Sequence, residues 1–122
     1  MVIGVGIDAV DIDRLRHVLA RTPSMRARVF TPGELAYADR HADPTERLAA
    51  RFAAKEALMK ALGVGLGAID FHDVEVVRLA SGQPELLVRG RAAALADEQG
   101  VQRWLISITH TATLAQAIVI AS

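Results

Sequence analysis

Hydrophobic and polar positions alternate at the start of the chain. The stretch from Met1 to Ala9 has a period of two residues and predicts a strand. One face of this strand is apolar, whereas the other carries Gly4 and Gly6 with Asp8 beyond them. Because glycines let another element pack closely, we expect Asp8 to lie where a carboxylate can reach a ligand or a metal ion. The alternative at this stage is that Asp8 caps the helix that follows.

The rest of the chain follows the order βαααββαββ. Helices are predicted from Asp11 to Arg21, with a further helical turn up to Val29, and from a capping box that begins at Thr31 to about His41. The remaining predicted elements are a helix at 45–62, strands at 74–79 and 85–88 joined by a hairpin turn at 81–84, a helix at 90–98, and strands at 104–108 and 114–121. Strands and helices do not alternate regularly, so we expect an α+β fold in which a small, mostly antiparallel sheet packs with helices.

The decapeptide at 51–60, Arg-Phe-Ala-Ala-Lys-Glu-Ala-Leu-Met-Lys, contains both lysines of a chain that otherwise uses arginine as its cation. It lies in the predicted helix at 45–62, which Gly63 ends. An apolar stripe and a broad alanine face both need cover, so we expect one charged edge of this helix to line a cleft. Glu56 and Lys60 share such an edge. The alternative is an exposed ion pair between these two side chains, worth about 0.3–0.5 kcal/mol.

Two glycine patterns invite a nucleotide interpretation. The segment 4–9 fits the permissive dinucleotide pattern G-x-G-x-x-A, but the strand before it is too short, Asp8 would repel a pyrophosphate, and no βαβ unit follows. The loop Gly63-Val-Gly-Leu-Gly67 follows a helix, whereas phosphate-binding loops precede one. We therefore reject the first pattern and interpret the second as a helix cap and turn, with backbone contact to a ligand as the alternative.

Composition limits the class of protein further. The 122 residues carry no net charge and are 52% hydrophobic, which supports a single domain over 1–122 and indicates surface that is buried in an oligomer. The absence of cysteine excludes disulfides and Cys-based zinc sites. The chain has no apolar run long enough to span a bilayer and no signal-peptide pattern, so we expect a cytoplasmic protein. We expect neither a nucleic acid nor a membrane as a partner.

The segment 10–30 nevertheless has five arginines and two acids, which suits an acidic protein partner. The alternative is an ordinary solvated face.

Asp8 and Glu56 together suggest a metal site. Mg²⁺ commonly takes one or two protein carboxylates and completes its shell with water and substrate phosphate oxygens. Lys60, one turn beyond Glu56, would reach the same phosphates. These groups are the minimum equipment for phosphoryl-type transfer.

Five motifs occur in the order that is typical of one enzyme family. They are Gly4-x-Gly-Ile-Asp8, Phe30-Thr-x-x-Glu34, the block from Arg51 to Gly63, Gly82-x-Pro84 and Ser107-Ile-Thr-His110. Together they resemble the holo-acyl-carrier-protein synthase type of 4′-phosphopantetheinyl transferase over nearly the whole chain. The final motif departs slightly, because Thr109 stands where that family more often has serine.

The resemblance implies transfer of the 4′-phosphopantetheine arm of coenzyme A to a serine of apo-acyl carrier protein, with release of adenosine 3′,5′-bisphosphate. It implies that Asp8 and Glu56 hold Mg²⁺, that Glu56 or a metal-held water takes the serine proton, and that Lys60 stabilises the diphosphate. It also implies a homotrimer with active sites at subunit interfaces. The residues implied to contact the nucleotide are His110, Arg51, Lys55 and Thr109, and those implied to dock the carrier protein are Arg14 and Arg21.

Two other classes of function stay open from the residues alone. One is a non-catalytic oligomeric module that binds a nucleotide or a carrier protein. The other is a metal-dependent hydrolase of a nucleotide diphosphate, which would use the same carboxylates with water as the nucleophile.

Overall fold

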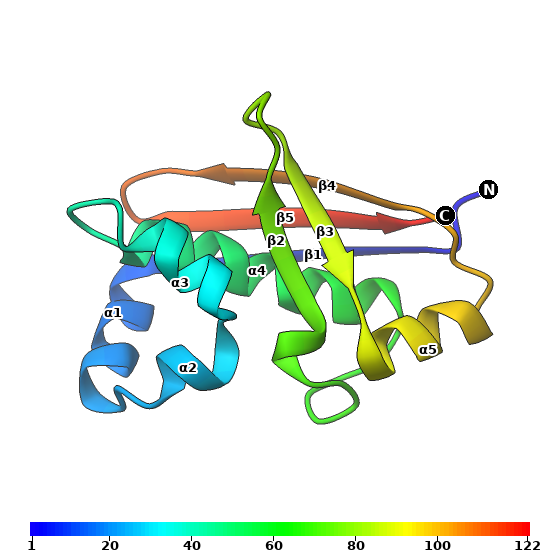
Figure 1. Cartoon of the computed structure of the whole chain (residues 1–122), viewed down its shortest axis with the longest axis horizontal. Helices are drawn as coiled ribbons and strands as arrows, with labels where there is room; N and C mark the ends of the chain where they lie inside the picture. Colours follow the sequence, from blue (N-terminus) through cyan, green and yellow to red (C-terminus); the bar gives the residue numbers. More distant parts are fainter.

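Helix α4 (Thr45–Ala61) is the element against which the rest of the chain packs (Figure 1). In the computed structural model, which describes residues 1–122, a three-stranded antiparallel sheet of order β1-β5-β4 lies against one side of α4. A separate two-stranded hairpin, β2–β3, crosses α4 from the other side. The elements besides α4 are β1 (Gly4–Asp11), α1 (Ile12–Arg21), α2 (Met25–Val29), α3 (Pro32–Ala38), the 3₁₀ turn η1 (Phe71–Asp73), β2 (Val74–Arg78), β3 (Pro84–Val88), α5 (Gly90–Glu98), β4 (Trp104–His110) and β5 (Leu114–Ala121). The expected α+β fold with antiparallel strands is confirmed, but the strands form two small sheets where one was expected.

The alanines of α4 allow it to sit in the centre of the fold. Small side chains let neighbouring backbones approach, and the alanines at 49, 50, 53, 54, 57 and 61 are all buried. The approach is closest at β1. A Cβ atom added to Gly6 would lie 1.8 Å from the carbonyl oxygen of Ala57, and one added to Gly4 would lie 1.9 Å from that of Ala61. The helix ends where predicted, because Gly63 has a φ of +73° that other residues rarely adopt.

Strand β1 lies a few residues further along the chain than its predicted position at 1–9. It runs from Gly4 to Asp11 because β5 pairs with it along its whole length, with Asp11 opposite Leu114. Because β1 extends to Asp11, the residue that caps helix α1 is Asp11. The Asp11 carboxylate accepts a hydrogen bond from the Arg14 amide at 3.0 Å, so Asp11 caps α1 and the alternative role of Asp8 as a cap is wrong.

The face of the three-stranded sheet that points away from α4 is open. Even-numbered positions of β1 face the helix, whereas Val5 and Ile7 on the other face are 54% and 58% exposed. Leu105 of β4 and Ile118 of β5 are exposed as well. An apolar sheet face of this kind is unusual for a protein that acts as a single copy.

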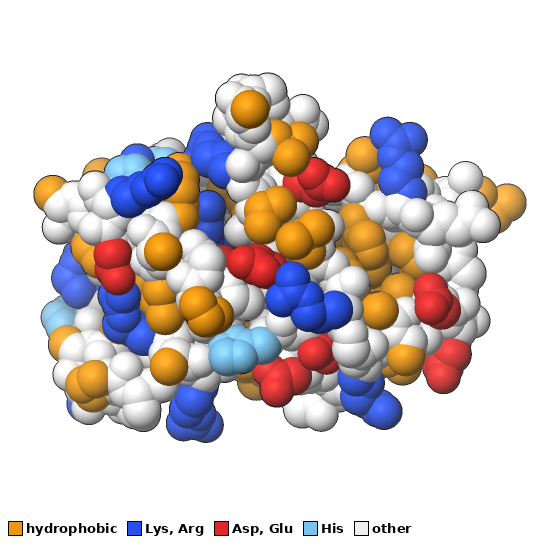
Figure 2. Space-filling view, in the orientation of Figure 1, with side chains coloured by type: hydrophobic (Ala, Val, Ile, Leu, Met, Phe, Trp, Pro, Cys, Tyr) orange, Lys and Arg blue, Asp and Glu red, His pale blue; other side chains and the backbone are white.

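Charged side chains of both signs are mixed over the face that carries α3, the hairpin and α5 (Figure 2). No helix of the fold has the length and apolar character that a bilayer crossing needs. The two chain ends lie next to one another, at the end of the sheet away from α1 (Figure 1).

Candidate active site

A pocket of about 540 Å³ lies where β1, α1 and α4 meet, and both Asp8 and Glu56 line it. Asp8 faces α4 because it shares the inner face of β1 with the two glycines that let the helix approach. The lining also includes the apolar side chains of Met25 and Phe52, together with Arg14 from α1. The pairing of Asp8 with Glu56 that the sequence suggested therefore occurs in one cavity.

Lys60 joins this pocket through Asp8. Its Nζ lies 3.1 Å from the Asp8 carboxylate and donates to the carbonyl oxygen of Ile7 at 3.0 Å. The alternative interpretation, an exposed ion pair between Glu56 and Lys60, is wrong because Lys60 bridges to β1 instead. The Lys60 side chain is 54% exposed, so its ammonium is accessible to a ligand that binds at Asp8.

The pKa of Glu56 is raised above its ordinary value. Burial is the main cause, the nearby negative charge of Asp8 adds to it, and Lys60 opposes it. A carboxylate with a raised pKa is a better proton acceptor near neutral pH. Two carboxylates that repel one another also favour a divalent cation between them, and two is the number that Mg²⁺ commonly takes from a protein. No group of three or more His, Asp or Glu side chains that could hold a metal ion occurs in the fold.

We expect the Glu56→Gln variant to unfold at a higher temperature than the wild type at pH 7 without divalent metal. A raised pKa means that the fold disfavours the ionised form of Glu56, so the free energy of unfolding falls as pH rises through that pKa. Glutamine carries no charge and so avoids this loss of stability. The gain should shrink as pH falls and Glu56 becomes protonated, which thermal unfolding in EDTA across a pH series would measure. A gain that did not depend on pH would contradict the assigned cause.

A second cavity, of about 380 Å³, contains Arg51 together with Arg40, Arg78 and Tyr37. Arg51 is 4% exposed, and its guanidinium lies 4.4 Å from the centre of the Tyr37 ring. Its Nε has no hydrogen-bond partner, and burial lowers the pKa of the guanidinium. None of the three arginines forms an ion pair. Glu75 also lines the cavity, but its carboxylate is paired with Arg89 and accepts a hydrogen bond from Thr31. The three unpaired arginines therefore allow the cavity to hold an anion.

His110 and Thr109, which were also expected to contact the nucleotide, likewise lie outside the catalytic pocket. His110 ends β4, and its Nδ1 lies 4.0 Å from the Glu46 carboxylate at the start of α4. Thr109 lines a small cavity on the open face of the sheet, next to Ile7 and Ile118. Within one chain, the structure does not bring Arg51, Thr109 or His110 to Asp8.

Lys55 does not fit the expected contact with a nucleotide. Its side chain is 1% exposed, and its Nζ lies 2.8 Å from the Glu34 carboxylate. It also donates to the carbonyl oxygens of Phe71 and Val74 at 2.9 and 2.6 Å. Burial lowers the pKa of Lys55, which the Glu34 charge opposes. All the acceptors of the ammonium lie inside the fold, so Lys55 joins α4 to α3, η1 and β2.

The arginines of the segment 10–30 divide into two groups. Arg16 pairs with Asp13 and Asp43, and Arg26 pairs with Asp39. Those without an acidic partner are Arg14, Arg21 and Arg28, which are all exposed. They lie on α1 and α2, and Arg14 also lines the pocket that contains Asp8 and Glu56.

The chain is similar to known proteins over its whole length. Residues 4–118 match the sequence profile of the 4′-phosphopantetheinyl transferase superfamily. The holo-[acyl-carrier-protein] synthase of Frankia alni is 47% identical over 120 residues, which cover 98% of this chain and 97% of that protein. The crystal structure of the Neisseria meningitidis holo-[acyl-carrier-protein] synthase has a TM-score of 0.91 and 32% identity, and covers 100% of this chain and 99% of that one. The Helicobacter pylori synthase in complex with coenzyme A has a TM-score of 0.85 and 30% identity, over 97% of this chain and 99% of that one.

Proposed function

This chain belongs to the 4′-phosphopantetheinyl transferase superfamily, and from that premise we propose that it transfers the 4′-phosphopantetheine arm of coenzyme A to a serine of an apo-acyl carrier protein. The proposal takes residues 1–122 as one transferase domain. The observation that carries it is that Asp8 and Glu56, from two elements, line one pocket, with the ammonium of Lys60 3.1 Å from the Asp8 carboxylate. A relative that binds coenzyme A and has the same fold supports the choice of donor.

In the proposed reaction, the serine hydroxyl oxygen forms a bond to the β-phosphorus of coenzyme A. The bond from that phosphorus to the bridging oxygen breaks, and adenosine 3′,5′-bisphosphate leaves with the electron pair. Glu56 takes the serine proton, a role that its raised pKa favours. Lys60, whose exposed ammonium contacts Asp8, stabilises the negative charge that grows on the diphosphate.

Asp8 and Glu56 are the residues that would hold Mg²⁺. The fit rests on their mutual repulsion in one pocket, which a divalent cation relieves. When bound, the ion supplies positive charge that neutralises the diphosphate oxygens. Before the ion binds, Lys60 fixes the position of the Asp8 carboxylate through their contact at 3.1 Å.

We propose a homotrimer in which the active sites lie between subunits. Two observations support this assembly. The open sheet face exposes Val5 and Ile7, and a neighbouring subunit would cover them. The cavity that contains Arg51, like His110 and Thr109, lies outside the catalytic pocket of its own chain. In the proposed trimer these side chains bind the nucleotide part of coenzyme A held at the Asp8 pocket of the adjacent copy. Lys55 has no part in this binding.

We assign docking of the carrier protein to Arg14 and Arg21, which lie on α1 and have no acidic partner. Arg14 borders the pocket, so a carrier bound there presents its serine to Glu56.

We expect Arg14→Glu to raise KM for the carrier protein about tenfold or more, because an attractive contact becomes a repulsive one, and to change KM for coenzyme A little. Steady-state kinetics with each substrate varied in turn would measure this. Arg103→Glu, a change at an exposed position before β4, is the matched control. Equal effects on both KM values would contradict the docking role.

Nucleotide release with and without carrier protein separates this proposal from its two rivals. A transferase releases adenosine 3′,5′-bisphosphate only when the apo-carrier is present. A hydrolase of nucleotide diphosphates would release it from coenzyme A alone, and a binding module would release none. Chromatography of the reaction mixture, with the Glu56→Gln variant beside the wild type, distinguishes the three.

A further inference from the structure

Three elements build the cavity that contains Arg51. Helix α3 supplies Tyr37, helix α4 supplies Arg51 and strand β2 supplies Arg78. The Arg51 guanidinium lies 4.4 Å from the centre of the Tyr37 ring, and Arg78 donates to the Tyr37 hydroxyl at 3.1 Å. The two cations can therefore meet one anion only while α3, α4 and β2 keep their relative positions.

The buried ion pair between Lys55 and Glu34 joins the same three elements. The two side chains are 1% and 0% exposed, and Nζ of Lys55 lies 2.8 Å from the Glu34 carboxylate. That carboxylate also accepts hydrogen bonds from the amides of Thr31, which caps α3, and Val76 of β2, each at 2.9 Å. Lys55 donates in addition to the first carbonyl oxygens of η1 and β2, at 2.9 and 2.6 Å. The three N–H groups of the ammonium thus have three acceptors, which belong to α3, η1 and β2.

A buried ion pair of this kind is a poor device for stability alone. Taking both charges out of water costs free energy that their attraction does not clearly repay, and uncharged side chains of similar volume are often as stable. The best-attested use of such a pair is to fix the register of packed elements. Lys55 lies one turn beyond Arg51 on α4, so the pair fixes α3 and β2 against the part of the helix that carries Arg51.

The same network controls the one carboxylate that lines this cavity. The Thr31 hydroxyl donates to the Glu75 carboxylate at 2.9 Å, and Arg89 pairs with the other oxygen of Glu75 at 2.9 Å. Thr31 is held in turn by Glu34, which accepts its amide. The negative charge that would compete with a bound anion is therefore fixed by partners other than the arginines of the cavity.

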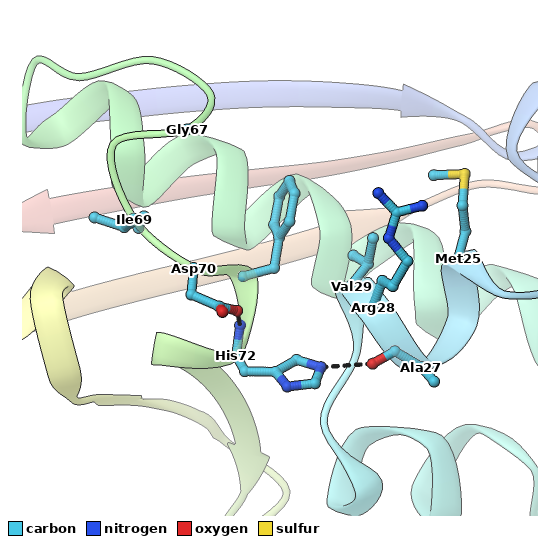
Figure 3. A pocket seen from close by; sticks show the side chains of 9 residues that line it. Met25, Ala27, Arg28, Val29, Gly67, Ile69, Asp70 and His72 are labelled. Carbon is cyan, nitrogen blue, oxygen red and sulfur yellow. Dashed lines mark hydrogen bonds between the residues drawn. The ribbon is translucent and has the colours of Figure 1, made fainter.

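The 3₁₀ turn η1, which Lys55 contacts, is also held from its outer side. The His72 ring lies with Nε2 2.7 Å from the carbonyl oxygen of Ala27 on α2 (Figure 3). The Asp70 carboxylate accepts a hydrogen bond from the His72 amide at 2.8 Å and caps the turn. Because these contacts do not involve Lys55, the turn should stay folded when Lys55 is changed.

We propose that Lys55 and Glu34 are positioning residues for the nucleotide end of coenzyme A, because they hold α3 and β2 against α4 so that the arginines of the cavity meet one phosphate group. This inference rests on the proposed transferase function, which assigns the cavity to the nucleotide. Neither side chain touches the ligand, since neither lines the cavity and both are buried. The pair acts on binding rather than on the chemical step, because the pocket of Asp8 and Glu56 shares no lining residue with this cavity.

The test measures the dissociation constant of adenosine 3′,5′-bisphosphate by titration calorimetry. Lys55→Met removes the ammonium and leaves the Glu34 charge buried without its partner, so it should also lower the unfolding temperature. The double variant Lys55→Met/Glu34→Gln removes both charges and should regain much of that temperature. Val101→Ala shortens a buried side chain that lines none of the cavities, so it is the control for a loss of stability alone.

We expect Lys55→Met and the double variant to bind the nucleotide about tenfold or more weakly than the wild type, and Val101→Ala to stay within about threefold of it. KM for coenzyme A should rise in parallel, while kcat at saturating coenzyme A should stay within about threefold of the wild type. The inference is overturned if the double variant binds as tightly as the wild type, or if Val101→Ala weakens binding as much as Lys55→Met does. A wild type that binds the nucleotide but leaves every apo-carrier unmodified would instead overturn the proposed function.

Discussion

The Glu56→Gln variant is expected to keep its fold and to lose transferase activity by about 10²–10⁴-fold, the range typical of a lost general acid or base. Glutamine has nearly the same shape as glutamate, so the packing of α4 should not change. It cannot accept the serine proton, and as a neutral group it is a weaker partner for Mg²⁺ than the carboxylate. Both losses act on the same step. Initial rates at saturating coenzyme A and carrier, with circular dichroism to verify folding, would measure the effect.

Glu98→Gln is the matched control, because Glu98 is an exposed carboxylate on α5. It should retain wild-type activity. A Glu56→Gln enzyme that turned over at a near-normal rate would remove Glu56 from the reaction. The higher unfolding temperature expected for the same variant adds a second criterion, since loss of activity with a gain in stability distinguishes a functional residue from a structural one.

Gly6→Ala should have the largest effect on stability. The new Cβ would lie 1.8 Å from the carbonyl oxygen of Ala57 and 2.7 Å from the amide of Ala61, and both are backbone atoms that cannot turn away. Overpacking by side chains commonly costs about 1–3 kcal/mol, and this clash with backbone should lower the free energy of unfolding by more than about 3 kcal/mol. Denaturant unfolding would measure the loss. Activity should fall too, because a displaced β1 moves Asp8 away from Glu56.

Gly65→Ala is the control for this substitution. A Cβ at Gly65 has no neighbour within 4 Å, and its φ is not in the left-handed region. Its free energy of unfolding should stay within about 1 kcal/mol of the wild type. If Gly6→Ala were equally harmless, the close approach of β1 to α4 would not be what positions Asp8.

The sequence predicted the elements of the site well because the signals were local. Alternation along β1 placed Asp8 on the face with Gly4 and Gly6, and these glycines do admit α4. The helical pattern around Glu56 and Lys60 was long and free of breakers, so its bounds were predicted closely. The charged edge of α4 that carries Glu56 does line a cavity.

Roles that depend on distant neighbours could not be predicted in this way. The sequence contains no sign that the ammonium of Lys55 meets the Glu34 carboxylate and the carbonyl oxygens of Phe71 and Val74, which are separated from it along the chain. Phe52 and Met25 also line the catalytic pocket. Their apolar side chains are typical of a protein core, so the sequence does not distinguish them from core residues. The 3₁₀ turn at Phe71–Asp73 was missed altogether, because so short an element has no periodicity.

The separation of Arg51 from Asp8 supports the proposed assembly. The fold places the carboxylates and Arg51 in separate cavities of one chain. The homotrimer that we propose, with active sites between subunits, would bring these two cavities to one substrate. It would also cover the exposed apolar residues on the outer face of the sheet.

The most direct test of the central claim is the intact mass of an apo-acyl carrier protein after incubation with this protein, coenzyme A and Mg²⁺. Parallel reactions would contain EDTA or the Asp8→Ala variant. We expect the carrier to gain the mass of one phosphopantetheine arm in the complete reaction, and to gain none when the metal or the Asp8 carboxylate is missing. A carrier that stayed unmodified in the complete reaction, with several carrier proteins tried, would contradict the assignment as a transferase.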